Sequence, residues 1–512
     1  MSNAGIQGPF CQTQTTGGWV QGLAHSGVCH FRGLPYGAST AGARRFAPPL
    51  PVAPWRGIRE CFGHGPVSPQ LPTPLTHRYG RLIHLDRSTA DGGIGEDCLH
   101  LNVWTPGLAD GAQRPVLFCV HGGGFAIGSG NSPLYDGAEL ARRHDVVVVS
   151  VSHRLGALGF LSLADVSAAP EFQSAGSNGI RDLVLALEWV RDNALALGGD
   201  PGCVTVFGQS GGGWKTSVLL ATPAARGLFH RAAVQSGSML RLPTPEDGAR
   251  LTAALLAGLG LAPASVSRLL ELPWQALVAA QEKLGALNFM PVLDGEYLPH
   301  HPCDPAAPPE SADVPLIVST TLDDASLFFE PGSIDEAALQ GWLATRYPDH
   351  AAQIRGLYRE RWPDEDAFLV HARIVTDSGF RRFAHLHAER KAAQGVAPVY
   401  CYRWDWATPS LGGAYGAAHA TDVAASLGND RDAIAGGGAA PGRAICDALA
   451  ASWVGFARRG DPKTAALPEW PPFEAVRRST LILDGVPRVE SDPLSELRLF
   501  WAAMPPAVSV FG

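Results

Sequence analysis

Residues 204–212, VTVFGQSGG, decide the fold of this chain. The first four are β-branched or aromatic and predict a buried strand, and the residues from Trp214 to Ala221 that follow have a helical pattern. Between strand and helix, residues 208–212 fit the pattern G-x-S-x-G, which places a serine on a tight strand-to-helix turn. Glycines beside the serine let neighbouring backbones approach closely. The stretch therefore predicts a strand–turn–helix unit with Ser210 held clear of the sheet at the turn.

Short apolar runs of the same kind recur along the chain, at residues 116–120, 146–151, 204–207, 232–235 and 315–319. Such continuous apolar strands are typical of a parallel sheet that is covered on both faces. Residues 180–197 carry apolar side chains at helical spacing, as in a helix packed on a sheet, and residues 17–36 alternate around glycines and predict antiparallel hairpins. The pattern indicates an α/β fold with a large, mostly parallel central sheet and helices on both faces.

The composition is that of a protein with a large core. The chain has 512 residues, 46% apolar and 17% charged, which excludes disorder as its main state. No apolar run reaches the roughly 18 residues of a membrane-spanning helix. Forty basic and 48 acidic residues give a net charge of −8, which argues against nucleic acid or a membrane surface as a partner. We expect one domain over residues 1–512, with a helical insertion at roughly 245–290 over one end of the sheet.

Nine scattered cysteines without a C-x-x-C pair argue against a disulfide framework or a zinc site and favour free thiols in a reducing compartment. His385 and His387 lie two residues apart on a helical stretch, so we expect diverging surface histidines and no metal site. Residues 1–10 lack the charged and apolar regions of a signal peptide. The prediction is a cytoplasmic location; a secreted or periplasmic location is the alternative if a signal peptide has been removed.

A glycine loop follows the first of the apolar runs. Residues 121–125, HGGGF, come directly after the strand that ends at Val120. A phosphate-binding loop would need a following Lys-Ser or Lys-Thr pair, and none is present. Together with the serine turn, the loop predicts an oxyanion hole. In it, the backbone N–H groups of Gly123, Gly124 and Gly211 would point at a carbonyl oxygen as it gains charge.

Six further segments carry a family resemblance: FRGLPY at 31–36, RFAPP at 45–49, EDCLHLNV at 96–103, HRLGALGF at 153–160, GLFHR at 227–231 and FARRGDP at 456–462. In kind and order, these segments, the glycine loop and the serine turn resemble the type-B carboxylesterase and cholinesterase family from end to end. The resemblance implies the α/β-hydrolase fold with a helical insertion over the active site. It also implies hydrolysis of small-molecule carboxylic esters through an acyl-enzyme, without a metal or an organic cofactor.

The resemblance also implies the remaining catalytic residues. In this family the acid lies in a stretch after a strand, here residues 321–326 (TLDDAS), and the base in a Gly-x-x-His stretch, here residues 416–422 (GAAHATD). It therefore implies that Asp324 is the acid and His419 the base for Ser210. The order serine, acid, histidine is that of α/β-hydrolases.

The chain departs from the family pattern at three positions. Asp324 is one methylene shorter than the usual glutamate, so Asp323 and Asp422 remain alternative acids. Gln209 stands where a glutamate commonly precedes the nucleophile, which removes a negative charge from the floor of the site and weakens the case for a cationic substrate. Ser68 stands where secreted members have a cysteine of their first disulfide, which supports an intracellular location.

Four aromatic residues are predicted to line a substrate pocket: Trp214, Phe125, Phe289 and Phe328. Trp214 could equally pack the helix. The loop from Leu71 to Asp91 and the helical insertion are expected to form other walls, around small or medium uncharged esters.

Two other functions are compatible with the same scaffold. An amidase or carbamate hydrolase would use the same residues, because the histidine could protonate a leaving amine. A binding module without catalysis would lack a triad member, whereas this chain keeps a nucleophile, an acid and a base. Relative rates on matched esters and amides separate the first alternative from an esterase.

Overall fold

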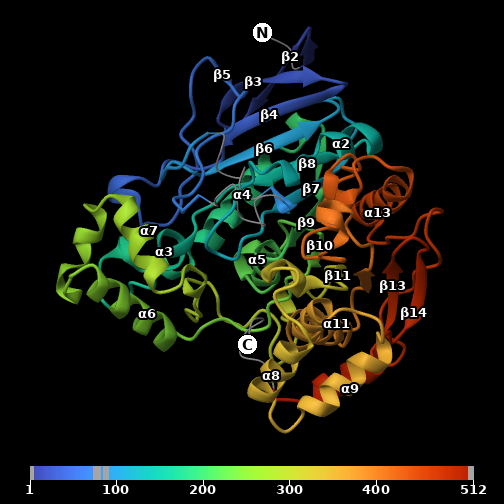
Figure 1. Cartoon of the computed structure of the whole chain (residues 1–512). Helices are drawn as coiled ribbons and strands as arrows, with labels where there is room; N and C mark the ends of the chain where they lie inside the picture. The colour runs from blue at the N-terminus through green and yellow to red at the C-terminus, as the bar shows by residue number, and fades with distance from the viewer. Residues whose placement is uncertain (1–4, 73–81, 85–91, 506–512) are drawn as a thin grey trace.

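In the computed structural model, which describes residues 5–72, 82–84 and 92–505, one sheet runs through the whole molecule (Figure 1). In sheet order its strands are β1 (Gly5–Gln7), β2 (Phe10–Thr15), β3 (Gly18–His25), β4 (Val28–Pro35), β6 (His100–Thr105), β8 (Val147–Val151), β7 (Arg114–Val120), β9 (Gly199–Gln209), β10 (Arg231–Gln235), β11 (Leu316–Thr321), β12 (Val399–Trp404), β13 (Ser479–Leu483) and β14 (Arg488–Ser491), with β5 (Ile58–Glu60) paired to β3. Neighbours from β8 to β13 are parallel. The other pairs on this path are antiparallel.

The central strand β7 shows why the sheet is covered on both faces. Every residue of β7 is buried. Val116 and Phe118 pack into one hydrophobic core, and Leu117 and Cys119 pack into another, because successive side chains of a strand point to opposite faces. The prediction of a mostly parallel sheet buried on both faces is confirmed.

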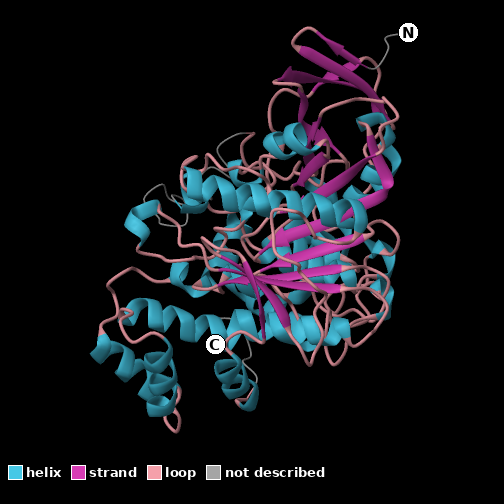
Figure 2. Cartoon of the chain, turned by 90° about the vertical axis from the view of Figure 1, so that its right-hand side faces the viewer, coloured by secondary structure: helices cyan, strands magenta, loops and turns pink. Residues whose placement is uncertain are grey.

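Helices form a layer on each side of the sheet (Figure 2). The first core joins the sheet to α4 (Asn178–Asn193), α5 (Gly211–Leu220) and α11 (Arg382–Ala392). The second joins it to α2 (Ala138–His144) and α13 (Ala440–Arg459). The apolar stripe of each helix faces the sheet, which is the arrangement that a doubly covered parallel sheet requires.

Two groups of helices lie outside these layers. The segment predicted to be helical contains α6 (Pro245–Gly258), η8 (Pro263–Leu270) and α7 (Trp274–Lys283), which share a small core with α3 (Gly156–Phe160). In the second half of the chain, a second group of helices shares a core of its own: α8 (Glu336–Arg346), α9 (Ala351–Arg361), α10 (Ala367–Thr376) and α14 (Ser495–Ala503). No single helix among the described residues is long and apolar enough to cross a membrane, although the bent pair α6 and η8 passes that test together by length and composition.

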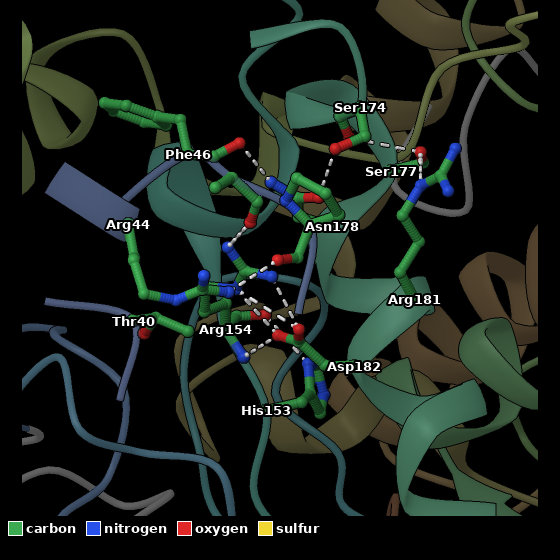
Figure 3. Close-up of polar contacts among 12 residues, drawn as sticks. Thr40, Arg44, Phe46, His153, Arg154, Ser174, Ser177, Asn178, Arg181 and Asp182 are labelled. Carbon is green, nitrogen blue, oxygen red and sulfur yellow. Dashed lines mark hydrogen bonds and ion pairs between the residues drawn. The ribbon is translucent and has the colours of Figure 1, made fainter. Parts of the chain in front are cut away.

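A buried ion pair joins α4 to the segment that follows β8 (Figure 3). Arg154 Nη2 lies 2.7 Å from Asp182 Oδ1, and the Arg154 backbone N–H donates to Asp182 Oδ2 at 3.0 Å. Neither side chain is more than 2% exposed. Arg154 Nη1 also donates to the carbonyl oxygen of Ala47, and Asn178 Nδ2 donates to that of Phe46. These hydrogen bonds fix the segment that contains Phe46 and Ala47 against α4.

Neither of the two histidines predicted to lie on the surface is exposed, and His385 is half-buried. His387 is 3% exposed, and its Nδ1 lies 3.2 Å from Ser238 Oγ. The prediction of surface histidines is therefore wrong, because α11 packs against the sheet in the first core. All nine cysteines are free. Across residues 5–72, 82–84 and 92–505, no group of three or more His, Cys, Asp or Glu side chains could hold a metal ion.

Candidate active site

The predicted site residues follow the carboxyl ends of neighbouring parallel strands. The glycine loop follows β7, Ser210 follows β9, Asp324 follows β11, and His419 lies in the long connection after β12. Ligands of open α/β sheets bind at this edge, where loops from several strands converge. The sheet thus gathers chemistry-bearing residues from about 300 residues of sequence.

Ser210 occupies a strained turn between β9 and α5. Its backbone has φ 58° and ψ −124°, and its N–H donates to the carbonyl oxygen of Gln235 at 2.8 Å. A Cβ at position 208 would overlap the backbone of Gly212, and one at position 211 would overlap the backbone of Gly124. The two glycines are therefore required by close backbone approach. Ser210 caps the N-terminus of α5, where the helix dipole favours developing negative charge.

His419 and Asp324 form a buried pair. His419 Nδ1 lies 2.8 Å from Asp324 Oδ1, and the two side chains are 3% and 0% exposed. The other carboxylate oxygen of Asp324 accepts hydrogen bonds from Ser236 Oγ at 3.0 Å and from the Thr321 backbone N–H at 2.9 Å. His419 Nε2 is buried without a hydrogen-bond partner among the described residues. The hydrogen bond at Nδ1 therefore fixes the orientation of the ring, and Nε2 is available to accept a proton.

The two alternative acids are bonded elsewhere. Asp323 accepts a hydrogen bond from Arg373 Nε at 2.7 Å and from the Ala417 backbone N–H at 2.9 Å, so it joins the acid loop to the histidine loop. Asp422 Oδ2 accepts from Tyr402 Oη at 2.7 Å and from Gln235 Nε2 at 3.0 Å. Of the three candidate carboxylates, Asp324 is the one bonded to the histidine ring.

Asp422 gives a pH-dependent prediction. Burial, opposed in part by the Tyr402 hydrogen bond, raises the pKa of Asp422 to about 6. The folded state therefore binds this proton more tightly than the unfolded state, so the stabilisation is full below about pH 4 and is lost as the pH rises through 6. A difference of about two pKa units corresponds to about 3 kcal/mol. Asp422→Asn stays neutral, so in urea unfolding from pH 4 to pH 7 it should gain about that much relative to the unsubstituted chain.

The comparison rests on the trend with pH. The amide of the variant does not titrate. Any change in hydrogen bonding that it causes, including at the position of Asp422 Oδ1, which has no partner among the described residues, therefore shifts the stability by the same amount at every pH. A stability difference between the two proteins that stays the same from pH 4 to pH 7 would contradict the raised pKa.

The glycine loop packs against the serine turn, backbone to backbone, at Gly124 and Gly211. The N–H of Gly122 donates to Tyr135 Oη at 2.8 Å. Gly123 and Gly124 have φ of 90° and 63°, values that favour glycine. Among the described residues, no acceptor is found for the N–H groups of Gly123, Gly124 and Gly211. Gly124 and Gly211 are buried and Gly123 is half-buried. Buried backbone donors are rarely left unpaired, so these N–H groups are candidates for binding an oxygen atom.

Two of the four predicted pocket residues do not line an accessible space. Phe125 and Phe289 are 0% exposed. Phe289 lies in the small core that α3 shares with α6, η8 and α7. Phe125 is packed between Phe160 and Trp214, with ring centroids 5.0 and 5.9 Å away. The prediction is corrected for both residues, because each ring is buried in a hydrophobic core.

The other two have partly exposed rings. Trp214, on α5, stacks on Phe125, and Phe328 lies 5.3 Å from the His419 ring. A residue that the sequence did not single out, Leu287, reaches the loop: its Cδ2 is the atom that a Cβ at position 124 would meet first. Most of the predicted wall from Leu71 to Asp91 lies outside the described residues.

Two further side chains support the site and were not predicted. Ser236 bonds the acid, and Tyr135 bonds the glycine loop. Ser236 comes directly after the run at 232–235 that predicts a strand, so its place at the active edge of the sheet could have been found. Tyr135 gives no such signal.

A serine on a strand-to-helix turn that packs against a glycine loop, together with a buried aspartate–histidine pair, is typical of serine hydrolases. With the strand order of this sheet, it defines the class as serine hydrolases of the α/β-hydrolase fold.

Comparison with known proteins gives the family. The profile of the Carboxylesterase family matches residues 8–496. The para-nitrobenzyl esterase of Bacillus subtilis is 34% identical over 94% of this chain and 96% of its own. The phenmedipham hydrolase of Pseudarthrobacter oxydans is 33% identical over 92% and 94%. A crystal structure of a Geobacillus stearothermophilus carboxylesterase superposes with a TM-score of 0.83, at 35% identity, over 96% of this chain and 99% of that one.

The chain belongs to the carboxylesterase family. It is a carboxylic ester hydrolase that works as a serine hydrolase on small-molecule esters. The resemblance read from the sequence is confirmed, and an amidase or a module without catalysis is not favoured.

Proposed function

We propose that Ser210, His419 and Asp324 are the catalytic triad and that Gly123, Gly124 and Gly211 form the oxyanion hole. The observation that carries the proposal is the 2.8 Å contact between His419 Nδ1 and Asp324 Oδ1. It leaves His419 Nε2 as the nitrogen available to a nucleophile.

In the first step, His419 Nε2 removes the proton from Ser210 Oγ as the oxygen attacks the ester carbonyl carbon. Asp324 accepts the Nδ1–H bond, which fixes the tautomer that has a free Nε2 and stabilises the imidazolium that forms. The tetrahedral oxygen takes the negative charge and is stabilised by the three glycine N–H groups. One such donor contributes about 10²–10³ in rate in related chemistry.

The cycle closes in three proton transfers. His419 gives its proton to the departing alcohol oxygen, the C–O bond breaks, and an acyl-enzyme on Ser210 remains. A water molecule then loses its proton to His419 and attacks the acyl carbon. The carboxylic acid leaves, and Ser210 Oγ recovers the proton. These steps are balanced without a metal or an organic cofactor.

The substrates we propose are small or medium uncharged esters. Trp214 and Phe328 supply partly exposed aromatic surface near the site. Leu287 adds aliphatic surface beside the glycine loop. Gln209, buried in the floor, carries no charge that would attract a cation. Neither nucleic acid nor a membrane is part of this proposal.

We further propose that the enzyme works in the cytoplasm. The support is the set of nine free cysteines, eight of them buried, which suits a reducing compartment. Reduced and oxidised thiol counts in protein isolated from its native cells would separate this location from a secreted or periplasmic one.

Fluorophosphonate labelling tests the triad. The probe should form a single adduct on Ser210, found by intact mass and peptide mapping, because an activated serine displaces fluoride from phosphorus. Asp324→Asn should lower the labelling rate by about 10³–10⁴-fold, since the amide favours the wrong histidine tautomer. A thermal melt confirms that the variant is folded. An adduct elsewhere, or labelling of a folded Asp324→Asn within tenfold of the unsubstituted rate, would remove Asp324 from its role.

A further inference from the structure

A lysine is buried inside α5, one turn beyond the nucleophile. Lys215 is 0% exposed. Its Nζ donates a hydrogen bond to the carbonyl oxygen of His121 at 3.0 Å and lies 5.9 Å from the centroid of the Phe125 ring. His121 is the residue that leads from β7 into the glycine loop. Lys215 therefore links the helix that begins at Ser210 to the start of the loop that carries Gly123 and Gly124.

The two parts of the proposed oxyanion hole come from different segments, so their spacing must be set by contacts between them. A Cβ at Gly212 would overlap the carbonyl of Val120 and lie 3.1 Å from that of His121. The segments thus pack backbone against backbone. Within the described residues, the Lys215 bond is the one hydrogen bond found between residues 121–125 and α5.

The His121 carbonyl oxygen is the one hydrogen-bond partner found for Lys215 Nζ among the described residues. No carboxylate of the described residues is within ion-pair distance of it. Burial lowers the pKa of Lys215 well below its ordinary value. The neighbouring imidazoles of His121 and His153, stacked at 4.9 Å, are also buried, and burial followed by the nearby Lys215 lowers their pKa. A neutral amine still donates, so the bond to His121 does not require a charge. Burying a polar group costs free energy unless it is bonded.

We propose that Lys215 is a positioning residue for ester hydrolysis: through the His121 carbonyl, it holds the glycine loop at the distance from α5 at which all three N–H groups reach one oxygen. The inference rests on the proposed oxyanion hole and adds a residue that touches neither substrate nor reacting atoms. Small displacements of such donors are costly, since a shift of about 1 Å can lower a rate by about 10²-fold.

The test uses Lys215→Met, which keeps the length and apolar stem but removes the donor. With active sites titrated by a fluorophosphonate, kcat per site should fall about 10- to 100-fold while KM stays within about threefold. Affinity for an aryl trifluoromethyl ketone, which adds to Ser210 and places an oxyanion in the hole, should fall in parallel. The matched control is Lys391→Met. Lys391 is also buried, and its Nζ donates to the carbonyl oxygen of Ala312 at 3.0 Å, away from the site.

The control should lose stability but keep its kcat per titrated site and its ketone affinity. If Lys215→Met does not fold, Lys215→Gln replaces it, because its amide nitrogen is one bond too short to reach His121, and the same losses are expected. Values within twofold of the unsubstituted enzyme for both readouts would overturn the role of Lys215. A failure of the proposed triad is a different result, because the unsubstituted enzyme would then give no titration on Ser210.

Discussion

Ser210→Ala should lower kcat for a p-nitrophenyl ester by about 10⁴-fold or more, which is the usual cost of removing a nucleophile from a triad. The fold should be unaffected, because no hydrogen bond of the Ser210 hydroxyl is found among the described residues, and alanine meets the same backbone conformation as serine. The variant should also give no burst of alcohol release and no fluorophosphonate adduct. Steady-state rates, burst amplitude and a thermal melt measure the three effects.

A second serine on the same helix provides the control. Ser217 donates to the carbonyl oxygen of Gly213 within α5, and Ser217→Ala should keep its turnover within about tenfold. If Ser210→Ala retained 1% or more of the turnover, and this activity copurified with the protein, the acyl-enzyme route through Ser210 would be wrong.

Asp182→Ala should lower the free energy of unfolding by about 3–5 kcal/mol, because it leaves the buried Arg154 guanidinium without its counter-charge. Urea unfolding, followed by intrinsic fluorescence, measures the shift in midpoint. Replacing both partners by apolar side chains, Arg154→Met with Asp182→Leu, should be less harmful than Asp182→Ala alone, since no unpaired charge remains buried.

The matched control is an exposed pair. Glu139 and Arg142 form an ion pair on α2 with both side chains more than 40% exposed, and Glu139→Ala should leave the midpoint almost unchanged. If the double variant at 154 and 182 lost as much stability as the sum of its single variants, the charges would not be coupled and the prediction would be wrong.

The central strands could be predicted because burial on both faces leaves a continuous apolar run. The runs at 116–120, 146–151, 204–207, 232–235 and 315–319 all fall in or overlap strands β7 to β11. Strands β12 and β13 were not identified. β12 reads VYCYRW, where Arg403 and two tyrosines interrupt the apolar pattern, although the structure buries all six residues. Tertiary contacts such as the hydrogen bond from Tyr402 Oη to Asp422 allow this burial, and no local pattern records them.

The catalytic residues also differ in whether a local sequence pattern predicts them. Ser210 follows from a local strand–turn–helix pattern, whereas Asp324 and His419 are joined by a contact across 95 positions. Seventeen histidines and 48 acids offer too many pairs, so only family resemblance could select this one. Among the aromatic residues, the sequence predicts Phe125 and Phe289 as pocket residues, and the structure buries both. Their rings point into cores, and a side chain's direction depends on packing.

Lys215 carries a sequence signal of its own. It is one of four lysines in the chain, and it stands in the run KTSVLL, within a helix whose other residues are small or apolar. A charged residue among such neighbours is rarely buried without a purpose. The amino-acid pattern alone is therefore enough to mark the inner face of α5 as unusual, although the partner of the amine, the His121 carbonyl, follows only from the packing of α5 against β7.

The order of the catalytic residues along the chain also determines when the enzyme becomes active during its synthesis. Ser210 leaves the ribosome with β9, but His419 and the strand before it, β12, are added some 200 residues later. A nascent or truncated chain that ends before β12 therefore carries a serine without a base, an alcohol no more reactive than any other on the chain. We expect reactivity toward esters and organophosphorus compounds only after His419 has been added and β11 and β12 have paired, so a chain that ends before β12 carries an unactivated serine.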